Sequence, residues 1–222
     1  MLDFIVWNPD VVAFHLITFP VRWYSLCWVL ALVWAYICMK RLYTKQGIEE
    51  KLFEPLFLYC FIGVLAGARL GHCLFYEPAY YLNHIVEMLL PIRHYEDGWR
   101  LVGYEGLASH GGVIGLCVAI WLYSRKTGVK MMTVFDNMGI TVGLSCAFIR
   151  LGNLMNSEIV GNTTNAWWGF VFVRNGEDFA RHPAQLYEAI AYVLIFIIIM
   201  FLYKSQVAKT KVDNSRLKVG NG

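Results

Sequence analysis

Charged residues are scarce in this 222-residue chain: Asp, Glu, Lys and Arg make up 16% of it, against 58% apolar residues. Soluble globular domains carry about 25% charged residues, so the composition excludes that class. The net charge of +3 is too small to indicate a nucleic-acid partner. Internal repeats and low-complexity segments are also lacking.

The six cysteines lack the spacing of a redox or metal motif. No Cys-x-x-Cys pair occurs, and no cysteine has a histidine at metal-ligand spacing. All six lie inside apolar runs and are interpreted as small packing residues. We therefore expect no disulfide framework, no metal site and no cofactor.

Apolar runs of about 17 to 21 residues recur, long enough to cross a hydrocarbon core of about 30 Å. These runs lack the alternation of apolar and polar residues that is typical of β-barrel strands, so we predict that they are helices. The fold class is an all-α, polytopic transmembrane protein with about five spans. The predicted spans are 23–39, 55–75, 106–123, 131–151 and 184–203.

Basic residues are distributed unequally between the two sides of these spans. The segments that follow the first, third and fifth spans carry 12 of the 19 Lys and Arg residues. Positive-inside bias then places the amino terminus outside. We predict a single membrane domain over 1–222, with an interfacial segment 1–22, outer segments 76–105 and 152–183, and a cytoplasmic tail 204–222. Residues 167–173 are predicted as a short strand.

The most informative stretch is 147–161, where polar residues follow directly on the fourth span. On a helix, Arg150, Asn153 and Ser157 would share one face, and Gly152 would let another backbone approach closely. A guanidinium inside a span costs up to about 3 kcal/mol, so it needs a partner or an anionic ligand. A snorkelling arginine would explain Arg150 alone, but not Asn153, Asn156 and Glu158 as well.

Two glycine-containing motifs have alternative interpretations. His110 opens the third span as a candidate general base; alternatively, Gly111 and Gly115 form a helix-packing motif and His110 is a hydrogen-bonded core residue. For Gly63, Gly67 and Gly71 in the second span, packing is the favoured interpretation.

Further charged residues lie in or next to other spans. Arg69 is flanked by apolar residues and requires a partner. Glu188 requires protonation or an arginine. Arg69, Arg150 and Arg181 outnumber the carboxylates near the outer boundary, and guanidinium groups suit phosphate. This pattern predicts a site for an anionic phospholipid headgroup.

Five motifs together resemble the prolipoprotein diacylglyceryl transferase family. They are residues 22–24 (RWY), 67–71 (GARLG), 109–112 (SHGG), 150–161 (RLGNLMNSEIVG) and 181–188 (RHPAQLYE). The resemblance implies a multi-pass enzyme of the bacterial plasma membrane. Such an enzyme moves the diacylglyceryl group of phosphatidylglycerol onto the lipobox cysteine of a prolipoprotein signal peptide and releases glycerol phosphate.

The resemblance also implies site residues. His110, Arg150 and Glu158 are the predicted catalytic residues, with His110 accepting the thiol proton and Arg150 holding the phosphate. The predicted substrate-binding residues, besides Arg150, are Tyr24, Arg69, Asn153, Asn156 and Gly161.

The family has seven spans, so we expect a chain truncated at its carboxyl end. The alternatives are a lipid-binding or transporter-like membrane protein, and an inactive truncated transferase.

Overall fold

The computed structural model describes residues 4–95, 97–101 and 106–219. Position 96 and positions 102–105 of the predicted outer segment 76–105 lie outside the described residues, as do positions 220–222 of the predicted tail. The chain is mostly helical, as predicted. It divides into two compact units, Met1–Met39 with Asn137–Gly222, and Lys40–Asp136.

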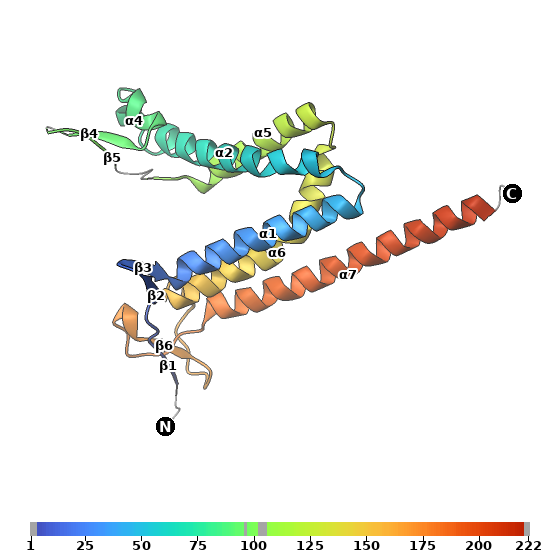
Figure 1. Cartoon of the computed structure of the whole chain (residues 1–222). Helices are drawn as coiled ribbons and strands as arrows, with labels where there is room; N and C mark the ends of the chain where they lie inside the picture. Colours follow the sequence, from blue (N-terminus) through green and yellow to red (C-terminus); the bar gives the residue numbers. More distant parts are fainter. Residues whose placement is uncertain (1–3, 96, 102–105, 220–222) are drawn as a thin grey trace. The chain divides into compact units, whose positions relative to one another are not determined.

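The first unit contains three long helices that run side by side (Figure 1): α1 (Trp23–Lys45), α6 (Met131–Met155) and α7 (Ala184–Val219). Ser145 of α6 donates to the carbonyl of Ala31 in α1 at 3.2 Å. The ring of Trp34 on α1 meets Phe196 of α7 edge-on, with centroids 5.3 Å apart. α6 therefore contacts α1, and α1 contacts α7, through side chains inside the predicted spans.

Short strands lie next to these helices. β1 (Ile5–Trp7) pairs in parallel with β6 (Phe170–Phe172), and β2 (Val12–Leu16) forms a hairpin with β3 (Phe19–Arg22). A short 3-10 helix, Val173–Asn175, follows β6. The strand predicted within 167–173 is confirmed as β6. The strands in segment 1–22 were not predicted; the partner of β1 lies far along the sequence, whereas β2 and β3 pair locally.

The second unit is built on close contact between α2 (Glu50–Phe75) and α5 (Ser109–Thr127). A Cβ on Gly67 would overlap the carbonyl oxygen of Gly111 and lie 2.8 Å from the Cα of Gly115. A Cβ on Gly71 would lie 2.8 Å from the Cα of Gly111. The packing interpretation of these glycines is therefore confirmed, because any side chain would force the helices apart.

The rest of the second unit lies between α2 and α5 in sequence. It comprises α3 (Pro78–Tyr81), α4 (Ile85–Leu89) and a hairpin of β4 (Ile92–Tyr95) with β5 (Gly98–Leu101). Glu87 of α4, 3% exposed, joins them. Its carboxylate accepts hydrogen bonds from Tyr80 Oη at 2.7 Å and from the His94 amide at 3.1 Å.

Burial by itself would raise the pKa of the Glu87 carboxyl. The hydrogen bonds from Tyr80 and from the His94 amide, together with the charges of His84 and Arg93, outweigh burial, and the pKa lies below its ordinary value of 4.5. The ionised carboxylate is thus favoured in the folded chain.

Within the described residues, four helices are long and apolar enough to cross a membrane: α1, α2, α6 and the Ala184–Val207 part of α7. They cover four of the five predicted spans. The other predicted span is α5, whose ends are polar, with Ser109 and His110 at one end and Arg125 and Lys126 at the other. The count of five spans and the external amino terminus stay predictions.

We predict that Gly67→Ala and Gly139→Ala change stability in opposite directions. Gly67→Ala should destabilise by about 1–3 kcal/mol, because its methyl group overlaps the α5 backbone. A methyl group on Gly139, which is also helical, would meet no neighbouring atom of the described residues within 4 Å. This alanine variant should be up to about 1 kcal/mol more stable, because alanine favours helix. Thermal unfolding of the two purified variants in detergent measures both stability changes. Equal shifts of the unfolding temperature would contradict the packing role of Gly67.

We predict an acid-dependent contribution of Glu87 to stability. Because its folded pKa is depressed, the contribution is complete above about pH 4.5 and is lost as the pH falls through the folded value. At neutral pH, Glu87→Gln should lower stability by about 1–3 kcal/mol. This deficit should shrink below about pH 4.5. Unfolding temperatures measured between neutral pH and pH values below about 4.5 test this prediction. Glu54→Gln, at an exposed position, is the control. A deficit that is independent of pH would contradict it.

Candidate functional site

The guanidinium of Arg150 bridges two helices of the first unit. Arg150 lies in the last turns of α6, and its Nε atom is 2.5 Å from Oε2 of Glu188 on α7. The side chain is 25% exposed. Glu188 thus has the arginine partner that the sequence required of it.

Amide side chains extend this pair into a chain of polar contacts. Nη1 of Arg150 is 3.5 Å from Oδ1 of Asn153, which is 4% exposed. Asn153 Nδ2 donates to Oε2 of Glu158 at 3.3 Å, and Asn156 Nδ2 donates to Oε1 at 3.1 Å. Both oxygens of the Glu158 carboxylate therefore accept an amide hydrogen bond.

The backbone after α6 adopts an unusual conformation around Glu158. Ser157 and Ile159 have φ angles of 58° and 55°. Residues with side chains rarely adopt this left-handed region, and for a β-branched residue it is an outlier. The helix ends at Met155, so Ser157 does not extend the face of Arg150 and Asn153 as the sequence predicted. Such strain typically gathers at functional sites.

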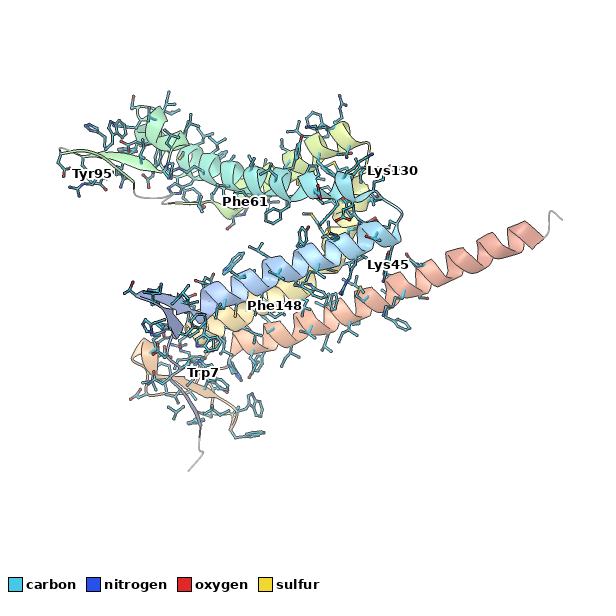
Figure 2. All side chains as sticks on the ribbon, in the orientation of Figure 1. Trp7, Lys45, Phe61, Tyr95, Lys130 and Phe148 are labelled. Atoms are coloured by element: carbon cyan, nitrogen blue, oxygen red, sulfur yellow. The ribbon has the colours of Figure 1, made fainter. Side chains whose placement is uncertain are left out.

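Neighbouring segments contact the end of α6 and the turn that follows it. Trp7 of β1, labelled in Figure 2, donates its indole Nε1 to the carbonyl of Leu154 at 2.9 Å. Its ring packs against Phe170 of β6, with centroids 5.3 Å apart. Asn175 donates to the carbonyl of Ser157 at 3.0 Å, and the buried Gln185 donates to that of Glu158.

Gly161 marks the end of the turn. Its amide donates to the carbonyl of His182 at 2.9 Å, and a Cβ there would lie 2.8 Å from the same oxygen. The carbonyl of Gly161 accepts from Nη1 of Arg181 at 3.3 Å. A hydrogen bond to the Glu177 carboxylate at 2.7 Å raises the pKa of Arg181. Only a residue without a side chain fits at position 161.

Tyr24 lies beside the same motif. A Cβ on Gly152 would be 3.0 Å from Cδ2 of Tyr24 and 3.2 Å from Cβ of Cys27. The close approach predicted at Gly152 is therefore made by α1, through Tyr24 and Cys27.

Two predicted site residues belong to the second unit. His110 is exposed in the first turn of α5, which does not fit a hydrogen-bonded core residue. Arg69 is 7% exposed; its Nη2 donates to the carbonyl of Glu87 at 2.7 Å and its Nε to that of Met88 at 3.2 Å. Its guanidinium also lies over the Tyr81 ring, 4.7 Å from the centroid. These contacts give Arg69 the partners that its burial requires.

Within the first unit, side-chain contacts connect Arg150, Asn153, Asn156 and Glu158, while Tyr24 packs beside Gly152 and Gly161 ends the turn. Sequence reasoning did not include Gln185 or Glu188 among the site residues, although the need of Glu188 for an arginine was a usable signal. The expected surplus of positive charge is not found in this cluster: Arg150 and Arg181 are paired with Glu188 and Glu177, and Glu158 adds another carboxylate. Among the described residues, no group of three His, Cys, Asp or Glu side chains could hold a metal ion.

The arrangement leaves part of Arg150 available. Its contacts with described residues use Nε and Nη1, and the side chain is partly exposed. A guanidinium has five N–H donors, so its Nη2 edge can donate to an anionic oxygen while Glu188 fixes its plane.

Comparisons with known proteins identify the family of the chain. A family model described as prolipoprotein diacylglyceryl transferase matches residues 11–217. A protein of Bacteroides fragilis named phosphatidylglycerol–prolipoprotein diacylglyceryl transferase is 52% identical over 200 residues, which cover 90% of this chain and 72% of that protein. Proteins of the same name from Porphyromonas gingivalis and Tolumonas auensis are 41% and 40% identical, over 90% and 91% of this chain and 70% and 74% of their own lengths. The chain belongs to the prolipoprotein diacylglyceryl transferase family.

Proposed function

We propose that this chain transfers the diacylglyceryl group of phosphatidylglycerol to the thiol of a prolipoprotein cysteine, the first step of lipoprotein lipidation. The observation that carries the proposal is the hydrogen-bonded chain from Arg150 through Asn153 to Glu158, within the longest motif of the family. The names of the relatives favour this activity over a lipid carrier or transporter.

The reaction forms a carbon–sulfur bond and breaks a carbon–oxygen bond. The thiolate attacks the glyceryl carbon that bears the phosphate ester, and glycerol phosphate departs with the bonding electrons. Free cysteine has a pKa of about 8.5, so the thiol needs a proton acceptor near neutral pH. His110 takes this role, since imidazole titrates close to neutrality.

Arg150 stabilises the departing phosphate through its Nη2 edge. Glu188 and Asn153 hold the guanidinium plane before the substrate arrives, which is the condition for effective charge stabilisation. Glu158, held by Asn153 and Asn156, presents a carboxylate that accepts hydrogen bonds from the glycerol headgroup. Tyr24 and Gly161 border this headgroup site, and Arg69 contributes a positive field.

The setting of the reaction follows from the apolar helices. The lipid donor and the acceptor, a signal peptide with a lipobox cysteine, both reach the chain from a lipid bilayer. We place the chain in the bacterial plasma membrane with its amino terminus outside, in agreement with the distribution of basic residues.

A transfer assay tests the proposal. The purified chain, in vesicles that contain phosphatidylglycerol, should lipidate a fluorescent lipobox peptide, detected as a mass increase of one diacylglyceryl group. Arg150→Lys should lower kcat/KM by about 10²-fold or more, because lysine keeps the charge but loses the planar fork. Arg174→Lys, an exposed position in the same segment, should behave like the unchanged chain.

Several outcomes would count against it. Absence of transfer by the unchanged chain would overturn the activity. If intact lipid moved between the two leaflets of the vesicle membrane and no thioether product formed, a transporter function would be favoured. His110→Gln with normal turnover would remove His110 as the proton acceptor and leave the rest of the mechanism in place.

A further inference from the structure

Gln185 is a buried amide next to the site that the proposed mechanism does not use. It lies in the first turn of α7 and is 1% exposed. Its Nε2 donates to the backbone carbonyl of Glu158. A carbonyl oxygen can only accept, so the amide must turn its NH2 group toward Glu158.

This contact leaves polar atoms buried without a partner. Oε1 of Gln185 and Oγ of Ser157 are both buried and have no hydrogen-bond partner in the part of the chain that the structure describes. Such groups normally cost stability. An apolar side chain at position 185 would avoid the cost at Oε1, so the amide is not explained by stability alone.

The backbone that Gln185 holds is itself unfavourable. The residues on either side of Glu158 both have left-handed φ angles, 58° at Ser157 and 55° at Ile159. Without an external bond, L-residues would tend to leave this region. The Gln185 amide donates to the carbonyl of the residue between them, where the bond opposes that relaxation.

The two unpartnered buried oxygens and the two left-handed residues thus lie around one carboxylate, that of Glu158. The strained turn directs Glu158 toward α6, where its amide donates to the Asn153 carbonyl at 3.0 Å. Its carboxylate oxygens accept from Asn153 at 3.3 Å and Asn156 at 3.1 Å. If the turn relaxed, the carboxylate would lose these two donors.

We propose that Gln185 is a positioning residue of the transferase site. Its side-chain amide holds the left-handed turn at residues 157–159 and so keeps the Glu158 carboxylate on Asn153 and Asn156. The role rests on the proposed function, in which Glu158 contacts the glycerol headgroup. Gln185 itself touches no substrate.

Gln185→Leu tests this role, because leucine preserves the apolar bulk and removes the N–H donor. It should lower kcat by about tenfold to a hundredfold, as expected for misplacement of an active-site group. The KM for phosphatidylglycerol should rise by no more than several-fold, because Arg150 still holds the phosphate and only the Glu158 contact with the glycerol headgroup is lost. Gln206→Leu, the same change at an exposed position of α7, is the matched control.

A second substitution separates positioning from general stability. Glycine adopts left-handed backbone freely, so Ser157→Gly should relieve strain and also remove the buried hydroxyl. The single variant Ser157→Gly should have a kcat close to that of the unchanged chain. The double variant with Gln185→Leu should have a kcat several-fold higher than Gln185→Leu alone. Trp7→Phe, which loses the bond to the Leu154 carbonyl, measures the effect of a comparable loss of stability on kcat.

Hydrogen exchange gives a readout that does not depend on turnover. In Gln185→Leu, the peptide covering residues 156–161 should exchange faster than in the unchanged chain, and Ser157→Gly should slow it again. Unchanged exchange and unchanged kcat in Gln185→Leu would overturn the role of Gln185. So would a kcat loss equal to that of Trp7→Phe at equal unfolding temperature. If the unchanged chain shows no transfer, the proposed function fails, and exchange alone decides whether Gln185 holds the turn.

Discussion

The constraint on which the first unit depends is that a guanidinium near the end of an apolar helix needs a partner. Arg150 has Glu188 of α7 as that partner, 2.5 Å away. In a low-dielectric setting, breaking such a pair leaves an uncompensated charge, so the contact fixes how α6 and α7 approach each other. The polar residues beyond Arg150 then have a defined place, and the strained turn can direct Glu158 back toward Asn153.

The second unit meets the same constraint differently. Arg69 is more deeply buried than Arg150, and it donates to the backbone carbonyls of Glu87 and Met88. These carbonyls accept hydrogen bonds from the guanidinium, and the Tyr81 ring adds a cation–π contact. These contacts fasten α4 to α2, so Arg69 organises local structure, while Arg150 is paired with a carboxylate between α6 and α7.

Much of the fold was predictable because membrane spans leave a strong local signal. Apolar runs located α1, α2, α6 and α7, and glycines at four-residue spacing predicted close helix packing on α2, although not its partner α5. Helix ends were less accurate: α2 begins at Glu50, five residues before the predicted start at position 55. β1 was missed because three residues carry little periodicity and their partner, β6, lies more than 160 residues away.

The sequence by itself determined the membrane character, the helices and the motif from Arg150 to Gly161, because hydropathy and residue chemistry are local properties. It also determined that Arg69 and Glu188 needed partners. Only the tertiary structure decided which partners these were, that Arg181 is paired with Glu177, and that Ser157 and Ile159 take left-handed backbone. Those outcomes depend on contacts of α2 with α4, and of α6 with α7 and the segment that joins them, and no local pattern encodes such contacts.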